Sequence, residues 1–379
     1  MDYDLSDEMK MLQDMSYKFA QAEIAPLSHE YDHEEKYTPE IRKKAAENGL
    51  VGAWIAEEYG GAGVGILGNT LIVEQLSRVD IGIGLNIYAA CFGLEAVNEF
   101  GTETQKQTYM PPVCQGAHVW SGAYTEPNAG TDVAGYKTRA VKDGDDYIIN
   151  GQKMFITNGT VCDYMLCQCI TNPEEKRHRQ FSQIIVPSNA PGVTRTKIKG
   201  KMGIRANDTA DISLEDVRVP RENLVGQEGK GFYQLMTFFD ITRIMVAGQA
   251  LGLSQGCLDE SIKYAKERTA FGQPIGSFQI SMQKMAEMAI RIEALRNLIY
   301  KAAWTVDVGK PDYTLAAMAK YYGGQTAVFS ANAAVEIHGG YGYIDEYKVQ
   351  KWYRDAKILE LYEGTKEAEI MTIGKVIQS

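Results

Sequence analysis

The sequence predicts an α+β protein of three consecutive domains, in the order helical, β and helical. Apolar residues recur at three-to-four spacing as far as residue 113, and the pattern then shortens to that of strands until about residue 225. Long helical patterns return after that point. We therefore expect an N-terminal α-helical domain at 1–120, a middle β domain at 121–225 and a C-terminal helical bundle domain at 226–379.

The first domain shows helical periodicity in five segments, which are 5–34, 38–49, 66–80, 84–100 and 104–113. Three glycines around the start of the third segment, Gly63, Gly65 and Gly68, formally match the dinucleotide-binding fingerprint. That fingerprint works only between a strand and a helix of a βαβ unit. The surroundings here are helical, so we reject a dinucleotide site of this kind.

The middle domain carries alternating, strand-like runs of residues. Two of them flank Asn150-Gly151, which is a strong hairpin signal, and Asp143-Gly144 predicts another turn just before. Further strand-like pieces are Phe181–Val186, 192–198 and 210–219. The pattern indicates a barrel or a sandwich.

The third domain contains helical patterns near 230–268, 275–307 and 311–337, each long enough for a bundle. In the second of them, an apolar stripe begins at Met282, Met285 and Met288, and we interpret it as core packing. The paired glycines after the third, Gly339 and Gly340, are interpreted on their own as a helix cap.

Composition and charge exclude several classes of protein. Lys plus Arg number 39 and Asp plus Glu 49, so the formal net charge is −10, which argues against a nucleic-acid binder. No apolar run approaches the roughly 20 residues that cross a bilayer. The acidic start at Met1–Asp4 lacks the features of a signal peptide, and we expect a cytoplasmic protein.

Cysteine and histidine spacing gives no sign of a metal site. The six Cys include no CxxC pair and are too few for a disulfide scaffold, and the five His lack metal-type spacing. There is no Gly-x-Ser-x-Gly elbow for a nucleophilic serine. We expect no bound metal and a reducing compartment.

Two short stretches have the composition of a binding or catalytic site. The loop Tyr124–Asp132 is dense in hydroxyls and glycine, and such a loop can wrap a polar heterocycle or a phosphate. In Leu361–Lys366 a carboxylate, Glu363, precedes Gly-Thr where the chain turns into a helix. Thr365 is equally suited to a plain helix N-cap, so on chemistry alone both readings stay open.

Over its whole length the sequence resembles the acyl-CoA dehydrogenase family of flavoenzymes. The resemblance rests on separated motifs in the correct order, which are Tyr124–Asp132, Asn150–Asn158, Phe239–Arg243, Glu267–Gly272, His338–Gly342 and Tyr362–Thr365. Each motif is weak evidence alone, but a chance match to all six of them in this order is implausible. The family implies a central β-barrel domain between an N-terminal helical domain and a C-terminal four-helix bundle, non-covalent FAD and a homotetramer.

The resemblance implies that Glu363 is the catalytic base. Oxidising a Cα–Cβ bond requires removal of a weakly acidic α proton, so the carboxylate must be desolvated and its pKa raised. Some relatives carry their base at the position of Thr242, which supports Glu363 as the only base here. Its backbone N–H is expected to bind the thioester carbonyl, and Gly364 to let the substrate approach.

The resemblance also assigns cofactor contacts. Thr157 would lie near flavin N5 and Phe155 on the ring, and the remaining flavin or phosphate contacts would be Tyr124, Thr125, Gly130, Thr131 and Thr365. The adenine and pyrophosphate, held partly by a neighbouring subunit, would meet Arg268, Phe271, Gln279, Glu336, Gly339 and Gly340.

Substrate contacts follow in the same way. Asp240 and Arg243 match the contact to the CoA nucleotide, and Thr131 would meet substrate or flavin phosphate. Acyl selectivity is expected from Leu85, Tyr88, Cys91, Phe92, Glu95 and Tyr362, although helix core is the alternative. No Arg or Lys lies between Asp80 and Phe100 to meet a dicarboxylic chain, so we expect a short, branched or alicyclic acyl group.

The implied function is FAD-dependent acyl-CoA dehydrogenation, with electrons passed to an electron-transfer flavoprotein. The same catalytic groups serve an enoyl-CoA reductase running the reverse reaction, so the sequence leaves the direction open. A flavin oxidase or monooxygenase on this fold and a non-catalytic helical scaffold are further alternatives, and the presence of Glu363 argues against both.

Overall fold

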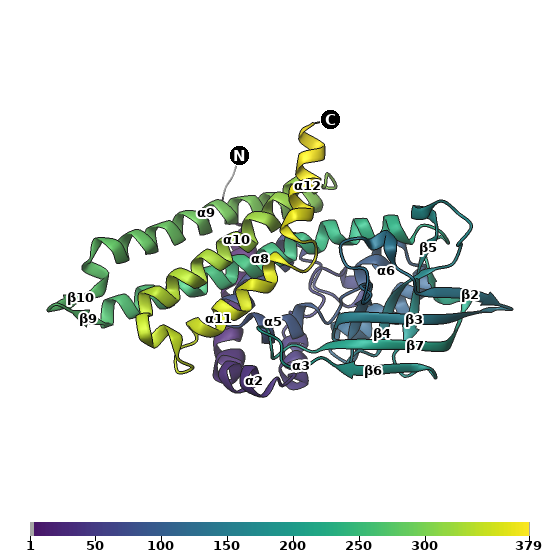
Figure 1. The fold of residues 1–379 in the computed structure, drawn as a ribbon, viewed down its shortest axis with the longest axis horizontal. Helices are drawn as coiled ribbons and strands as arrows, with labels where there is room; N and C mark the ends of the chain where they lie inside the picture. Colours follow the sequence, from purple (N-terminus) through teal and green to yellow (C-terminus); the bar gives the residue numbers. More distant parts are fainter. Residues whose placement is uncertain (1–3, 379) are drawn as a thin grey trace.

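The computed structural model describes residues 4–378. Met1–Tyr3, on which the expectation of no signal peptide largely rests, lie outside this range, as does Ser379. In Figure 1 the long C-terminal helices lie on the left, the sheet lies on the right, and N-terminal helices, in purple, lie below the long helices. The expected order of helical, β and helical domains is confirmed.

The N-terminal domain consists of short helices. They are Asp7–Phe19 (α1), Ser28–Glu34 (α2), Pro39–Glu47 (α3), Gly65–Val79 (α4), Ile81–Tyr88 (α5), Leu94–Phe100 (α6) and Glu103–Cys114 (α7). The continuous helix expected at 5–34 is broken by a π turn and a 3₁₀ turn that contains Pro26, which lacks an N–H donor. The helix expected at 84–100 is broken where Cys91 forms a β-bridge with Trp120 and Gly93 takes a φ of 103°.

The middle domain is one eight-stranded sheet. Its strands are Trp120–Ala123 (β1), Arg139–Asp143 (β2), Asp146–Thr157 (β3), Tyr164–Ile170 (β4), Phe181–Pro187 (β5), Val193–Lys197 (β6), Thr209–Pro220 (β7) and Leu224–Val225 (β8). They run in the order β6-β7-β3-β2-β4-β5-β8, and β1 pairs in parallel with β4. The sheet has an apolar core of its own, separate from the core that the two helical domains share.

The hairpin expected at Asn150-Gly151 is wrong, because β3 continues through both residues. The pairing of β3 with β7 shifts register between Ile149 and Gly151, which marks a bulge. Asn150 bonds Asp216 twice at 2.9 Å, and a Cβ on Gly151 would lie 2.4 Å from Thr138 Oγ1. The glycine therefore serves a close approach between backbones, and the expected turn at Asp143-Gly144 alone joins β2 to β3.

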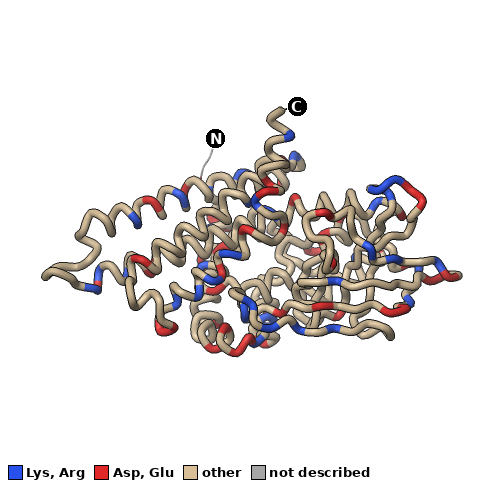
Figure 2. Tube along the Cα trace, in the orientation of Figure 1, with Lys and Arg blue, Asp and Glu red and all other residues tan. Residues whose placement is uncertain are grey.

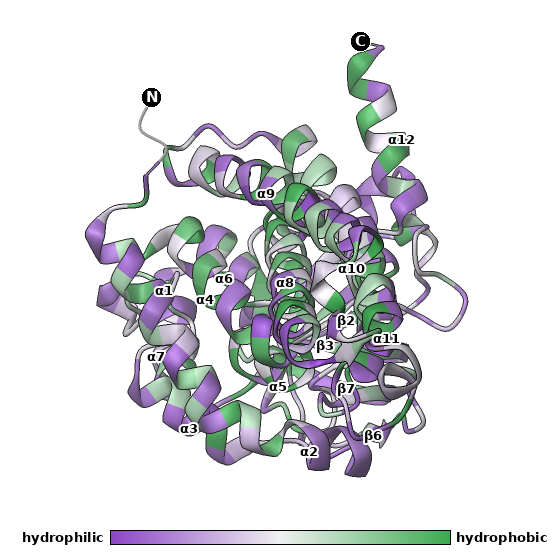
Figure 3. Ribbon diagram, turned by 90° about the vertical axis from the view of Figure 1, so that its left-hand side faces the viewer, coloured by the Kyte–Doolittle hydropathy of each residue, from purple (hydrophilic) through white to green (hydrophobic). Residues whose placement is uncertain are grey.

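The C-terminal domain consists of Gly231–Glu267 (α8), Gln279–Asp307 (α9), Tyr313–His338 (α10), Val349–Ala356 (α11) and Lys366–Ile377 (α12), with a small hairpin, Thr269–Ala270 (β9) and Gln273–Pro274 (β10), between α8 and α9. Helix α8 lies in the middle and packs on α4, α9 and α10 (Figure 3). Gly339, with a φ of 61°, caps α10 as expected. Met288 is buried, but Met282 is 46% exposed, so the prediction of core packing is wrong for the start of α9.

Charged residues of both signs are spread along the chain (Figure 2). One buried ionic cluster joins the N- and C-terminal domains: Lys351 Nζ lies 3.0 Å from Asp80 Oδ2 and 2.6 Å from Asp355 Oδ2. Within residues 4–378, no helix combines the length and the apolar character that a bilayer crossing requires.

Candidate active site

A cavity of about 420 Å³ lies where the β domain meets α8 and the segment before α12. We call it the main cavity. It brings together predicted residues from five separate parts of the chain, namely Phe92, Tyr124, Thr125, Gly130, Thr131, Phe155, Thr157, Arg243, Tyr362, Glu363, Gly364 and Thr365. Both of the short stretches singled out in the sequence therefore face one space.

Glu363 enters this cavity from a tight turn. Its backbone takes a φ of 53° and that of Gly364 a φ of 103°, just before α12 begins. Thr365 Oγ1 accepts a hydrogen bond from the N–H of Ala368 at 3.3 Å, so Thr365 is also the helix cap. The two readings of this stretch are thus compatible, since the cap fixes the turn that presents the carboxylate.

The environment of Glu363 suits a base. Burial raises the pKa of its carboxyl, while the hydrogen bond from Thr242 and the charges of Lys320 and Arg243 oppose that rise. Thr242 Oγ1 donates to Glu363 Oε2 at 2.6 Å. The family resemblance marks position 242 as the place where some relatives carry their base, and in this chain the Thr242 hydroxyl orients the carboxylate of Glu363.

Replacing Thr242 by Val is expected to raise the pKa of Glu363 further, because the ionised carboxylate loses its donor. A base must be deprotonated to act, so the rise of kcat/KM with pH should move to higher pH by about one unit. Thr237→Val is the control, because the Thr237 hydroxyl donates to the carbonyl oxygen of Tyr233 on the same helix, and its pH profile should not move. An unmoved profile in Thr242→Val would contradict the assignment of this hydrogen bond.

Lys320 is a site residue that sequence reasoning missed. It is 1% exposed on α10, and its Nζ donates to the carbonyl oxygen of Gly364. Burial lowers the pKa of Lys320 to about 8, although Glu369 and Glu363 oppose the change. The available signal was that Lys320 directly follows the apolar run Ala316–Ala319 on α10. We infer that it fixes the turn that carries Glu363.

Arg243 is enclosed by two carboxylates. Its guanidinium lies 2.8 Å from Asp240 Oδ1 and 3.1 Å from Glu369 Oε1. Burial raises the pKa of Asp240 to about 6 and also raises that of Glu369. The charge of Arg243 is therefore already opposed within the chain, and its contact with a CoA phosphate stays a prediction.

Besides letting the substrate approach, the glycine at position 364 leaves room for the side chain of Glu369. A Cβ there would lie 2.0 Å from Glu369 Oε1, on a backbone with positive φ. Glu369 is fully buried against this turn. The packing of Glu369 thus requires the glycine even without substrate.

The far side of the main cavity fits an aromatic heterocycle with polar edges. Phe155 lines it with 64% of its area exposed and a φ of 60°. Tyr124 is buried, and its Oη finds no hydrogen-bond partner among residues 4–378. The hydroxyl-bearing Thr125 and Thr157 border the same space. An exposed ring face beside the unpartnered hydroxyl of Tyr124 and the two threonine hydroxyls fits a flavin ring.

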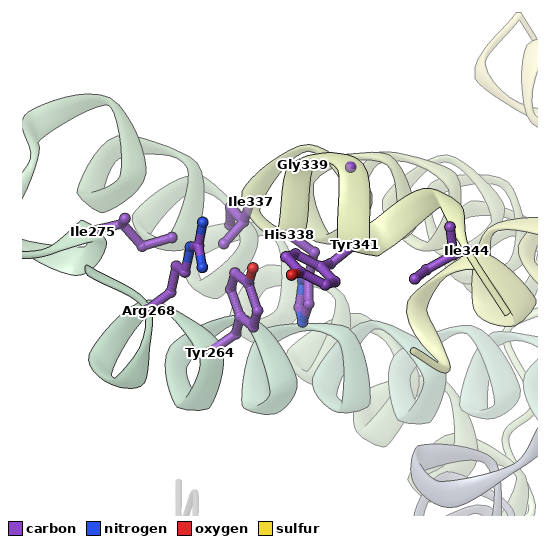
Figure 4. A pocket seen from close by; sticks show the side chains of 9 residues that line it. Tyr264, Arg268, Ile275, Ile337, His338, Gly339, Tyr341 and Ile344 are labelled. Carbon is purple, nitrogen blue, oxygen red and sulfur yellow. The ribbon is translucent and has the colours of Figure 1, made fainter. Parts of the chain in front are cut away.

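A second cavity, of about 430 Å³, lies between α8 and the end of α10 (Figure 4). It gathers the predicted residues Arg268, Gly339 and Gly340, together with Tyr264 and His338. The remaining predicted adenine or pyrophosphate contacts lie elsewhere. Phe271 is 97% exposed at the β9–β10 hairpin, Gln279 begins α9, and Glu336 pairs with Lys284.

A small cavity of about 30 Å³ adjoins the main one and shares four lining residues with it, Phe92, Thr157, Tyr362 and Glu363. We call it the acyl cavity. Leu85, Tyr88 and Glu95 also line it, as predicted for acyl selectivity. Cys91 lines neither cavity and donates its thiol to the carbonyl oxygen of Tyr88.

Comparisons with known proteins agree with this geometry. The chain matches models of the acyl-CoA dehydrogenase N-terminal domain over residues 6–117, middle domain over 121–217 and C-terminal domain over 229–378. An acryloyl-CoA reductase (NADH) of Anaerotignum propionicum is 38% identical, and the match covers 100% of this chain and 96% of that protein.

Solved structures are equally similar. The butyryl-CoA dehydrogenase from Megasphaera elsdenii is 38% identical with a TM-score of 0.97, covering 100% of both chains. A chain in a structure of the electron transferring flavoprotein of Acidaminococcus fermentans is 40% identical with a TM-score of 0.97, covering 100% of this chain and 99% of that one.

Proposed function

Because the chain belongs to the acyl-CoA dehydrogenase family of oxidoreductases, we propose that it dehydrogenates a short, branched or alicyclic acyl-CoA thioester between Cα and Cβ. Glu363 is the base in this proposal, FAD is the cofactor, and an electron-transfer flavoprotein is the electron acceptor. The observation that carries it is the Glu363 carboxylate, which faces the main cavity with a pKa raised by burial.

The chain's own residues account for the proton. Glu363 takes the α proton, and burial brings its pKa closer to that of a weakly acidic carbon acid. Thr242 holds Oε2 in place at 2.6 Å. The backbone N–H of Glu363 donates to no acceptor within the described chain, which leaves it for the thioester carbonyl, where negative charge develops.

FAD, when bound, supplies the acceptor for the hydride that leaves Cβ. Tyr124, Thr125, Phe155 and Thr157 are the residues that would hold its ring in the main cavity. Arg268, Gly339 and Gly340 lie in the second cavity, which shares no lining residue with the main one. The separation fits an assembly in which the second cavity of one subunit serves the FAD of its neighbour, and the assembly that we propose is the homotetramer implied by the family resemblance.

The acyl length follows from the space beyond Glu363. About 30 Å³ holds roughly two water-sized groups, which suits a short chain. The similar butyryl-CoA dehydrogenase of Megasphaera elsdenii supports this size. The similar chain in the structure of the electron transferring flavoprotein from Acidaminococcus fermentans supports the proposed acceptor.

An acyl-CoA panel tests the proposal. The purified holoenzyme should be yellow, and anaerobic mixing with butyryl-CoA or isobutyryl-CoA should bleach its flavin. With octanoyl-CoA, kcat/KM should fall by about tenfold or more, because the extra methylenes exceed the acyl cavity. A colourless protein would contradict the flavin assignment, and equal rates for both lengths would contradict the short acyl group.

The reverse reaction is a second candidate, supported by the similarity to the acryloyl-CoA reductase (NADH). A carboxyl with a raised pKa is also suited to donate a proton to Cα of an enoyl thioester. Reduced electron-transfer flavoprotein and NADH, each offered with crotonyl-CoA, separate the two directions. Turnover that is faster with crotonyl-CoA than with butyryl-CoA would favour the reductase.

A further inference from the structure

Glu95 is a buried carboxyl in the acyl cavity that the proposed chemistry does not use. It lies in the first turn of α6 and is 5% exposed. Its Oε2 accepts a hydrogen bond from the N–H of Gly93 at 2.8 Å. In the part of the chain that the structure describes, no Lys, Arg or His is among the groups that mainly shift its pKa.

Glu95 and Glu363 are the two carboxyl groups, among residues 4–378, that line the acyl cavity. Tyr88, whose buried hydroxyl has no hydrogen-bond partner in that part of the chain, and Thr157 also line the cavity. Its polar members Thr242 and Tyr362 are already engaged, with Glu363 and Gln249 respectively. The remainder of the lining is largely apolar, with Leu85, Ala89, Phe92, Met245 and Val246. Glu95 is therefore the acidic group, other than the proposed base, that the end of a short acyl chain in this cavity would meet.

A purely apolar chain is a poor match for this carboxyl. Covering it would remove its remaining solvent without providing a hydrogen bond, and buried polar groups without partners are costly. A hydroxyl or an amide N–H at the chain end would donate to it. A terminal carboxylate would instead place a third acidic group near Glu95 and Glu363. The charge of Glu363 already adds to the burial that raises the pKa of Glu95.

We propose that Glu95 is a specificity-determining residue, which selects short acyl thioesters whose chain ends in a neutral hydrogen-bond donor and rejects those that end in a carboxylate. This inference rests on the proposed function and adds the chemical class of the acyl group. Burial raises the pKa of Glu95 to about 7, and both its neutral and its ionised forms have an oxygen that accepts a hydrogen bond.

The test compares butyryl-CoA, 4-hydroxybutyryl-CoA and glutaryl-CoA on the holoenzyme and three variants. The wild type should prefer the hydroxylated chain over butyryl-CoA by about tenfold in kcat/KM, and Glu95→Leu should reverse this ratio. Glu95→Gln should retain the preference, because its amide oxygen still accepts, and should gain about tenfold with glutaryl-CoA. Glu99→Gln, an exposed position on the same helix, should match the wild type.

An unchanged ratio, within about twofold, in Glu95→Leu would overturn the proposal. If that variant does not fold, the absence of any gain with glutaryl-CoA in Glu95→Gln would overturn it equally. The same ratios are measured as Kd by calorimetry, which requires no turnover. Altered Kd ratios without flavin bleaching would count against the proposed function alone, whereas bleaching with unaltered ratios would count against Glu95 alone.

Discussion

Replacing Glu363 by Gln is expected to lower kcat for acyl-CoA oxidation by about a thousandfold, with FAD still bound. The amide keeps the shape of the side chain and can still accept the hydrogen bond from Thr242, but it cannot take a proton. Among residues 4–378, Glu363 is the one carboxylate that lines the main cavity. Steady-state rates with butyryl-CoA, together with the flavin spectrum of the purified variant, measure both parts of the expectation.

Glu367→Gln is the matched control, because Glu367 is exposed on α12 only four residues away. It carries the same loss of charge and should leave kcat within about twofold of the wild type. If Glu363→Gln retained full activity, or if both variants lost activity alike, the base would lie elsewhere.

Replacing Lys351 by Met is expected to lower the free energy of unfolding by about 3–5 kcal/mol. Lys351 is 3% exposed and lies between Asp80 and Asp355, which are both fully buried. Burial lowers the pKa of Lys351, but the carboxylates of Asp355 and Asp80 outweigh it and hold the pKa above its usual value. Without the lysine, two carboxylates between the N- and C-terminal domains would lose their counter-charge.

Lys348→Met tests whether burial, rather than charge alone, sets this cost. Lys348 lies just before α11 and pairs with Glu260 at 2.7 Å, but its side chain is 41% exposed. Its loss should cost less than about 1 kcal/mol. Denaturant unfolding of the two variants measures both values, and equal losses would contradict a special role for the buried cluster.

The elements that the sequence predicts best are those with a long, uninterrupted apolar period. Helices α4, α8 and α10 begin and end within a few residues of the expected bounds. The turn at Asn150-Gly151 fails because a local signal competes with a tertiary one: the backbone at Thr138 approaches Gly151 too closely for any side chain. The prediction that Met282 packs in the core fails because periodicity shows which face of a helix is apolar, but not which element covers that face.

In the candidate active site, too, the features that depend on local sequence were predictable and those that depend on tertiary packing were not. The segment around Glu363 was recognisable because a carboxylate, a glycine and a cap residue occur together in sequence. The Thr242 and Lys320 contacts join residues more than forty positions apart, and only the packing of α8 and α10 brings them to Glu363 and Gly364. The enclosure of Arg243 by Asp240 and Glu369 is likewise a property of the fold.

The most direct test of Glu363 as the base is anaerobic, single-turnover reduction of the bound flavin by butyryl-CoA. We predict that the flavin of the wild type bleaches, and that bleaching slows when the Cα hydrogens of the substrate are replaced by deuterium, because that bond breaks as Glu363 takes the proton. Bleaching at the same rate with both substrates, or in Glu363→Gln as fast as in the wild type, would contradict the account.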